Sequence, residues 1–489
     1  MKPKSKNAGA PPVKKKRAGR IARSAAGAPA VFMPGAAPEP AAAPPSLPAA
    51  SGASCIDSEA VAERLGIWWQ NAKEGAYYMP GPDGRWLELN ASNLRAALAA
   101  QGIEGRRAKD AALSDVDRVL LHVRERRAVD IALHGLAGYR AGCHEAAGRR
   151  ILVRTSPLII QPEASTDGWP TWNAFLSGIL GEVQKWHLLA WVKLGYEALA
   201  NGTLDRGQVC ILCGPPGGGK SRLQHFLFTP CFGGRAADPG AWLYGEDRFC
   251  DDLAGSEHLM SEDPPAVTKG EARAHLRERI KSLAVNDSFR VAAKFSRAEN
   301  LPPWWRVSVS LNDSPDSFRM LPALTHDLKD KVLLFRTTAA QMPMPTGTPA
   351  ERAAFRDRLA AELPTLLHDL TGDDLQRLHP HLFGGRFGLR EYADAELAAR
   401  LREDAPEMEL WDLIERTISA GEVWTGSAHD LEALLQGASS PVEESAKRFF
   451  RKMGAAKLLG RLAEDMPGIV TRGRSADARW WSIHRPAAS

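Results

Sequence analysis

The sequence contains few cysteines and no long apolar run. Its 489 residues include six cysteines, spread between Cys55 and Cys250, so we expect reduced thiols rather than a disulfide framework. No apolar stretch approaches the roughly 20 residues of a membrane span. The first residues also lack the apolar segment of a signal peptide. These absences favour a cytoplasmic protein without a membrane partner.

Residues 1–54 contain few acidic, aromatic or β-branched side chains. They carry nine lysines and arginines and one acid, Glu39, so their net charge is +8, while residues 55–489 carry −3. Such an Ala-, Pro- and Gly-rich segment cannot bury enough apolar surface to fold, and we expect a disordered basic tail. The run Lys14–Arg17 fits either a segment that neutralises nucleic-acid phosphates or a solvated end without a partner.

Residues 55–160 lack the carboxylate cluster of a polymerase, so we expect a small accessory α+β domain that positions or recruits another molecule. Two short strands are predicted on either side of the turn Gly81–Gly84. A helix is predicted over residues 93–101 and a further strand over residues 150–154.

A glycine-rich motif follows the apolar run of residues 209–213. Residues 214–221 fit the spacing G-x-x-x-x-G-K-[ST]. Glycines let successive backbone N–H groups turn toward one anion, and the following helix N-terminus adds partial positive charge. We predict an ATP-binding phosphate loop, in which Lys220 reaches the β- and γ-phosphates and Ser221 binds Mg²⁺. Its residues are Gly214, Pro215, Pro216, Gly217, Gly218, Gly219, Lys220 and Ser221.

Polar residues end two later apolar segments. Glu262 and Asp263 end the first of these segments. In an ATPase, one member of such a pair binds Mg²⁺ and the other orients the attacking water. We predict that Asp263 is the Mg²⁺ ligand and that Glu262 is the other catalytic carboxylate. Asn312 ends an alternating strand over residues 305–312. We predict that Asn312 is the polar sensor that contacts the γ-phosphate and its water.

The segment before the loop is rich in aromatic side chains, and its spacings favour buried helical faces rather than a base-stacking platform. Its apolar residues are Trp169, Trp172, Phe175, Leu176, Ile179, Leu180, Val183, Trp186, Leu189, Trp191 and Leu194. Cys210 and Cys213 form a C-x-x-C pair in the predicted strand. No second ligand pair follows, so we expect packing cysteines rather than zinc ligands.

With these motifs in order, residues 165–340 resemble the superfamily 3 helicases, particularly the helicase part of phage and plasmid primase-helicases. The matching segments are 214–221, 259–263, 280–294 and 307–312. The resemblance implies an α/β P-loop core of the AAA+-like kind. It also implies a DNA-translocating ATPase that forms a homo-oligomeric ring, usually a hexamer, and moves 3′ to 5′ on single-stranded or forked DNA.

The resemblance implies two further sites. One family region forms a hairpin that points into the central pore, and its predicted DNA contacts here are Lys294, Phe295 and Arg297. Many relatives also carry an arginine before the last core strand that reaches the neighbouring subunit's nucleotide. Lys331 stands at that place and is the predicted catalytic cation, but lysine lacks the bidentate fork of arginine. Arg336 and Arg319 therefore remain alternatives.

Helical patterns continue after the predicted ATPase domain, residues 161–345. We expect a helical connector over residues 346–406 and a winged-helix-like domain over residues 407–489, whose helices precede a terminal hairpin. Cations on its third helix, residues 446–462, and on the hairpin fit either a duplex backbone or a solvated basic face. They are Lys447, Arg448, Arg451, Lys452, Lys457, Arg472, Arg474 and Arg479.

Together these features predict an ATP-dependent DNA helicase or translocase that acts in replication of a phage, plasmid or integrated mobile element. No primase centre is visible in the sequence, so a separate primase or polymerase would be a partner. Two alternatives remain. One is an ATPase that loads or remodels a replication protein without unwinding, and the other is a DNA-binding initiator switched by nucleotide.

Overall fold

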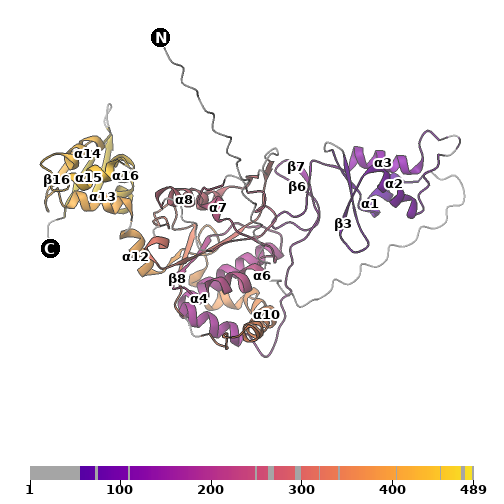
Figure 1. The fold of residues 1–489 in the computed structure, drawn as a ribbon, viewed down its shortest axis with the longest axis horizontal. Helices are drawn as coiled ribbons and strands as arrows, with labels where there is room; N and C mark the ends of the chain where they lie inside the picture. The colour runs from indigo at the N-terminus through magenta and orange to yellow at the C-terminus, as the bar shows by residue number, and fades with distance from the viewer. Residues whose placement is uncertain are drawn as a thin grey trace, which may run out of the picture.

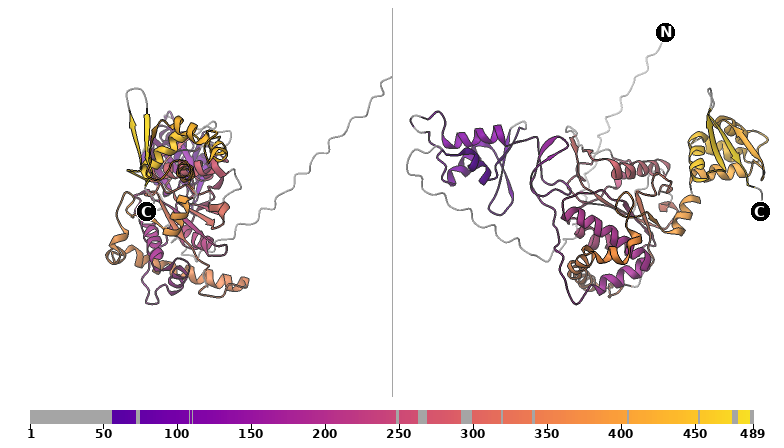
Figure 2. Two further views of the ribbon diagram at one scale, coloured as in Figure 1. Left: turned by 90° about the vertical axis from the view of Figure 1, so that its left-hand side faces the viewer. Right: turned by 180° about the vertical axis from the view of Figure 1, so that it is seen from behind.

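The computed structural model describes three parts arranged along the longest axis of the molecule (Figure 1). One part carries α1–α3, the central part surrounds β8, and the third carries α13–α16; the view from behind shows the same order (Figure 2, right). The described residues are 56–71, 75–107, 109, 111–247, 250–262, 269–291, 299–318, 320–339, 342–403, 405–451, 453–474 and 479–486. The predicted tail, residues 1–54, lies outside them. Within the described ranges no helix combines the length and the apolar character that a bilayer crossing requires.

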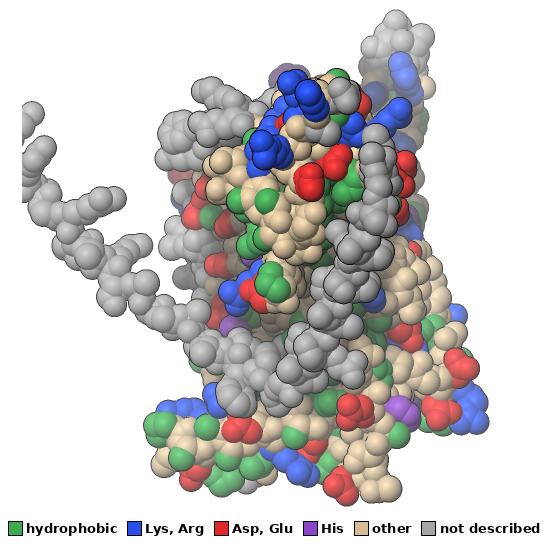
Figure 3. Space-filling model, turned by 90° about the vertical axis from the view of Figure 1, so that its right-hand side faces the viewer, with side chains coloured by type: hydrophobic (Ala, Val, Ile, Leu, Met, Phe, Trp, Pro, Cys, Tyr) green, Lys and Arg blue, Asp and Glu red, His purple; other side chains and the backbone are tan. Residues whose placement is uncertain are grey.

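The N-terminal part packs three helices on a four-stranded sheet of order β3-β2-β1-β4. Its elements are α1 (Ser58–Arg64), β1 (Trp68–Gln70), β2 (Ala76–Pro80), β3 (Trp86–Leu89), α2 (Ala91–Ala100), α3 (Asp115–Arg126) and β4 (Ala128–Val129). β2 and β3 pair antiparallel across Gly81–Gly84, as predicted, and α2 confirms the predicted helix. α2 starts where Asn90 accepts a hydrogen bond from the Asn93 amide. Figure 3 faces this end of the molecule and shows Lys and Arg side chains gathered near its top.

A three-stranded sheet links the N-terminal and central parts. It consists of β5 (Ile131–Leu133), β6 (Gly142–Ala146) and β7 (Arg149–Val153), in the order β5-β7-β6. β7 confirms the strand predicted over residues 150–154. Ile151 and Val153 are fully buried and share a hydrophobic cluster with β8, and Arg149 pairs with Glu299. This small sheet therefore packs on the central part.

The central part is built on six parallel strands in the order β15-β14-β8-β13-β10-β9. They are β8 (Val209–Gly214), β9 (Ala236–Ala237), β10 (His258–Glu262), β13 (Arg306–Asn312), β14 (Val332–Arg336) and β15 (Tyr392–Ala393). Every residue of β8 is buried, as expected for a parallel sheet covered on both faces. The register aligns Asn312 with Gly214 and Glu262 with Ser310. The sheet confirms the predicted α/β core.

One face of the sheet is covered by α4 (Pro170–Ala200), α10 (Pro349–Thr371) and the helical segment after the glycine-rich loop. That segment runs through α5 (Lys220–Leu223), a π-helical turn (Gln224–Phe228) and α6 (Thr229–Cys231). Trp172, Phe175 and Trp191 are at most 1% exposed in this layer. The aromatic segment is therefore core, as predicted. Short elements complete the layer: α11 (Asp374–Leu378) and a 3₁₀ turn (Pro380–Leu382).

The structure differs from the sequence prediction at a break in α4. Gly181 has φ 68° and ψ 172°, outside the helical region, so α4 is two helices that meet at this residue. The break shifts the helical phase, and Val183 is 66% exposed. The expectation that Val183 lies on a buried face was wrong for this reason.

The other face of the sheet carries α7 (Gly240–Leu243), α8 (Lys269–Val285) and α12 (Ala395–Glu403), with α9 (Pro315–Phe318) after β13. α8 confirms the predicted helix over residues 270–283. After it, β11 (Phe289–Val291) and β12 (Glu299–Leu301) pair antiparallel.

The C-terminal part packs four helices on an antiparallel sheet of order β16-β18-β17. Its elements are α13 (Pro406–Glu415), β16 (Val423–Gly426), α14 (Ala428–Gln436), α15 (Glu443–Phe450), α16 (Ala455–Asp465), β17 (Val470–Arg474) and β18 (Arg479–His484). The prediction of a single helix over residues 446–462 was wrong, because Gly454 adopts extended φ/ψ and caps the start of a new helix, α16. Lys447 and Arg448 consequently lie on α15, and Lys457 lies on α16.

Candidate nucleotide-binding site

The glycine-rich loop lies at the carboxyl end of β8, between β13 and β14. After β8, the chain forms β9, β10 and β13 on one side of this strand, and it then forms β14 and β15 on the other side. The direction in which strands are added therefore reverses at β8. Ligands of open parallel sheets bind at such a switch point, outside the carboxyl ends of the strands. The loop joins β8 directly to α5, and Gly217 and Gly219 have φ values of 74° and 84°. The structure thus has the predicted strand, loop and helix.

Close packing explains two of the loop glycines. A Cβ atom at Gly214 would lie 2.1 Å from the carbonyl oxygen of Thr337, the residue after β14, and one at Gly219 would lie 3.0 Å from the Phe175 ring. The Thr337 amide donates a hydrogen bond to the Cys213 carbonyl at 2.8 Å. The loop is therefore held between the segment after β14 and the first half of α4.

Lys220 and Asn312 meet at this edge of the sheet. The ammonium nitrogen of Lys220 donates hydrogen bonds to the carbonyls of Gly214 and Pro215 at 2.8 Å each, and lies 3.3 Å from Asn312 Oδ1. Lys220 is 7% exposed. The parallel pairing of β8 with β13 thus brings the predicted sensor beside the loop lysine.

Glu262 ends β10, two strands away from β8. Its carboxylate lies 3.4 Å from Nε2 of His225 in the helical segment after the loop, and its side chain is 39% exposed. Asp263, the other predicted carboxylate, lies outside the described residues. The sequence did not lead us to predict His225 at this site. Its spacing could have indicated it, since a residue four positions after Ser221 lies on the same helical face.

The predicted DNA contacts Lys294, Phe295 and Arg297 also lie outside the described residues. The strands on either side of them are described: β11 and β12 pair antiparallel, with Phe289 opposite Leu301. The segment that carries the three predicted contacts therefore connects two paired strands.

The candidate cations around β14 occupy opposite edges of the sheet. Lys331 precedes the strand, at the edge away from the glycine-rich loop; its side chain is 10% exposed and lies 2.6 Å from Asp330. Arg336 ends the strand beside Cys213, pairs with Glu396 and is 45% exposed. Arg319 lies outside the described residues. The structure thus places Arg336, and not Lys331, at the edge that carries the loop.

A buried polar network lies behind the loop. His258 contacts Thr229 through Nδ1 at 2.7 Å and Ser308 through Nε2 at 2.8 Å. Gln224 donates a second hydrogen bond to the Ser308 hydroxyl at 2.9 Å. Burial, assisted by nearby His225, lowers the pKa of His258 to about 3. A neutral imidazole therefore joins the helical segment after the loop to β10 and β13, a connection that no sequence pattern indicated.

Cys210 and Cys213 point to opposite faces of β8 and belong to different hydrophobic clusters. They cannot share one zinc ion, and among the residues with described placement no group of three or more His, Cys, Asp or Glu has a metal-binding arrangement. Burial raises the pKa of the Cys213 thiol to about 11. The predicted packing role is confirmed.

No family model and no curated protein matches the sequence. Among solved structures, the apo structure of the NrS-1 C-terminal region matches with a TM-score of 0.51 at 11% identity, over 89% of this chain and 100% of that chain. The SCCmec type IV Cch active helicase matches with a TM-score of 0.37 at 11% identity, over 86% and 92% of the two chains. The JCV helicase matches with a TM-score of 0.22 at 15% identity, over 49% and 66%. The chain shares its overall fold with the NrS-1 region.

Proposed function

We propose that this chain is an ATP-dependent DNA helicase or translocase with an AAA+-like core of the superfamily 3 kind. One observation carries the proposal: the phosphate loop and Asn312 meet at the carboxyl ends of β8 and β13, and Glu262 ends the next strand at the same edge. Phosphoryl transfer depends mainly on positioned charge around the phosphates and the attacking water. This edge supplies a cation, an amide and a carboxylate for that purpose.

The loop fits the phosphates of ATP, because its left-handed glycines and the helix that starts at Lys220 form an anion cradle. Ser221 is exposed at the start of that helix and Glu262 is partly exposed. Hydroxyl and carboxylate oxygens suit Mg²⁺, and Asp263 is the further proposed ligand. Bound Mg²⁺ would neutralise phosphate charge. Glu262 would orient the attacking water, with His225 within reach of its carboxylate.

The DNA-facing part of the proposal places Lys294, Phe295 and Arg297 on the connection between β11 and β12. A cation there tracks phosphates, and an aromatic ring can press on a base face. In the proposed homo-oligomeric ring, a hexamer in the usual family arrangement, a cation from one subunit completes the neighbour's site. Arg336 suits this role better than Lys331, because its side chain is 45% exposed beside Glu396 whereas that of Lys331 is 10% exposed beside Asp330.

The proposed biological setting is replication of a phage, plasmid or integrated element, with a separate primase or polymerase. The C-terminal part supports a DNA-binding role, because its helices precede a two-stranded hairpin as in a winged helix. A groove of about 490 Å³ between α16 and that hairpin is lined by basic and aromatic side chains: Lys457, Arg472, Arg474, Arg479, Trp480 and Trp481.

Strand separation of a forked DNA, measured beside DNA-stimulated ATP hydrolysis, tests the function. The proposal expects both activities, their loss in Lys220→Ala, and loss of DNA stimulation in Lys294→Ala. Hydrolysis that ignores DNA would instead indicate a remodelling or loading ATPase. Sequence-specific binding with negligible hydrolysis would indicate an initiator. Electron microscopy with a nonhydrolysable ATP analogue and forked DNA would report ring size and polarity.

A further inference from the structure

The helical segment after the glycine-rich loop contains a π-helical turn, Gln224–Phe228, directly after the four residues of α5. A π turn inside a helix is rare and often marks a functional site. Its first two residues face different surroundings. Gln224 is fully buried, whereas the side chain of His225 is 42% exposed and faces the carboxylate of Glu262. The turn therefore brings an imidazole to the end of β10.

A closed ring of hydrogen bonds fixes this turn. Gln224 Nε2 lies 2.9 Å from the Ser308 hydroxyl, which lies 2.8 Å from His258 Nε2. On the other side of the imidazole, Nδ1 lies 2.7 Å from the Thr229 hydroxyl, which donates to the Gln224 carbonyl at 3.0 Å. One direction of donation satisfies all these atoms, with the proton of the neutral imidazole on Nδ1. The ring thus starts and ends at Gln224.

The ring joins the turn to the strand that carries Glu262. His258 is the first residue of β10, and Glu262 is the last. Gln224 also donates a hydrogen bond at 3.4 Å to the carbonyl of Ser261, directly before Glu262. Because the turn is tied to β10 at both ends of the strand, the backbones of His225 and Glu262 keep a fixed spacing. Nε2 of His225 lies 3.4 Å from Oε1 of Glu262.

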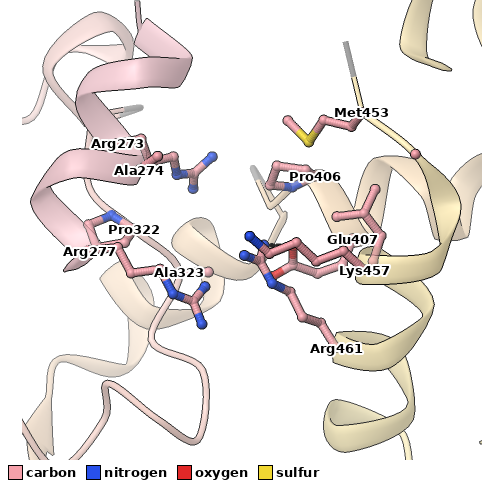
Figure 4. Close-up of a pocket in the computed structure, with 12 residues that line it drawn as sticks. Arg273, Ala274, Arg277, Pro322, Ala323, Pro406, Glu407, Met453, Lys457 and Arg461 are labelled. Carbon is pink, nitrogen blue, oxygen red and sulfur yellow. Dashed lines mark hydrogen bonds and ion pairs between the residues drawn. The ribbon is translucent and has the colours of Figure 1, made fainter. Parts of the chain in front are cut away.

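A second pair shows what a purely structural contact looks like. The cleft between α8 and α16, of about 260 Å³, is lined by Arg461 and Glu407 among others (Figure 4). Arg461 donates a hydrogen bond to Glu407 at 3.2 Å, and Glu407 is 2% exposed. That carboxylate is shielded from water. The side chain of Glu262 is 39% exposed instead, so a reacting water can reach it.

A carboxylate that stands free at a surface samples several rotamers, whereas catalysis requires one orientation. We propose that His225 is a positioning residue, which holds the Glu262 carboxylate toward the glycine-rich loop. His225 follows Ser221 by four residues on the same helical face, so its contact draws the carboxylate toward the proposed Mg²⁺ ligand. This role rests on the proposed ATP hydrolysis and is independent of DNA. His225 acts in it only through Glu262.

Two variants separate the N–H of the imidazole from its ring. His225→Phe keeps a ring of similar shape and removes the donor, whereas His225→Gln removes the ring and keeps an N–H donor. In steady-state ATP hydrolysis, kcat of His225→Phe should fall by about 10- to 100-fold, the usual cost of losing a group that orients another, with KM nearly unchanged. His225→Gln should recover most of the rate. Equal losses in both variants would indicate ring packing and overturn the inference.

A double-mutant cycle tests whether His225 acts through Glu262. Glu262→Asp keeps the charge but shortens the side chain by one methylene, which moves the carboxylate away from the imidazole. Adding His225→Phe to this variant should lower kcat no further, because coupled residues are not additive; a full additional loss would overturn the inference. The matched control is His429→Phe, at an exposed histidine on α14, which should keep the wild-type kcat. The thermal midpoint reports folding of each variant.

Wild-type kcat in folded His225→Phe would overturn this inference and leave the proposed function intact. Wild-type protein that binds ATP without hydrolysing it would contradict both. The expected loss and recovery of kcat in a protein that separates no DNA strands would support the inference and contradict the helicase function.

Discussion

Asn312 Oδ1 lies 3.3 Å from the ammonium nitrogen of Lys220. The two side chains come from adjacent strands, and the contact exists because Asn312 is aligned with Gly214 in the sheet. An amide beside the loop cation is placed where the proposed sensor role requires it. The strand register, which aligns Asn312 with Gly214, is what brings these two side chains together.

Asn312→Ala should lower kcat for ATP hydrolysis by about 10²- to 10³-fold, the usual cost of losing one preorganised polar contact. Nucleotide affinity should change less, since the loop and Lys220 remain. Lys220→Ala should instead abolish nucleotide binding. Steady-state hydrolysis and titration with a fluorescent ATP analogue distinguish the two. Asn300→Ala, at an exposed amide on β12, serves as control, and full activity in Asn312→Ala would remove its sensor role.

Glu262→Gln and Asp263→Asn should each retain nucleotide binding and stop hydrolysis, because the carboxylates act on the water and Mg²⁺ rather than on the loop. Single-turnover hydrolysis beside binding measures both effects. Glu278→Gln, at an exposed acid on α8, should behave as wild type. A wild-type rate in either site variant would show that this carboxylate has no part in the chemistry.

Gly214→Ala should destabilise the central part by about 1–3 kcal/mol, the typical cost of overpacking, because the added Cβ meets the Thr337 carbonyl. Nucleotide affinity should fall as well, since the loop must move. Thermal unfolding and nucleotide titration give the two readouts. Gly105→Ala has no neighbour within 4 Å and should change neither; equal effects at both positions would mean that the Thr337 contact is not the cause.

His258 should make the strands behind the loop less stable in acid. Unfolded imidazole takes up a proton below its ordinary pKa of 6.5, whereas burial lowers the folded pKa to about 3. The contribution of neutral His258 to the free energy of unfolding is therefore fully present above pH 6.5. It decreases between pH 6.5 and 3, by at most about 1.4 kcal/mol per pH unit. Hydrogen exchange of β10 and β13 peptides measures this slope.

The neutral variant His258→Gln should show a smaller slope than wild type in that experiment. His326→Gln, which changes an exposed histidine, should retain the wild-type slope. Identical slopes in wild type and His258→Gln would show that protonation of His258 does not limit the acid stability of these strands.

Deletion of residues 1–54 tests the predicted role of the tail. If its lysines and arginines contact phosphates, the truncated protein should show a shallower salt dependence of DNA binding, because fewer counterions are released. A tail of the same length with neutral side chains should behave like the deletion. Equal slopes with and without the tail would leave it without a role in DNA binding.

Local sequence signals predicted the core well. The loop has fixed spacing around Lys220, and β8, β10, β13 and β14 are short apolar runs with polar ends, so periodicity located them. The side chains at the carboxyl ends of parallel strands then share an edge, which brought Asn312 and the loop together.

Other features depended on information that short patterns do not carry. A single glycine inside a helical pattern is usually tolerated, so neither the break at Gly181 nor the new helix at Gly454 was predicted. The contacts of His258 join segments far apart in sequence. The cleft between α8 and α16 arises from the packing of two parts of the chain, which no motif records.

The place of β14 beside β8 has a consequence for synthesis of the protein. β8 lies between β13 and β14, and Thr337 packs on Gly214, so the ribosome must add roughly 120 residues after the loop before the central strand has both neighbours. Such distant pairings form slowly, and an unpaired apolar strand is open to aggregation. A growing chain that has not yet passed Thr337 therefore carries the whole loop sequence while one side of β8 still lacks its neighbour, and the apolar strand is most open to aggregation during this interval.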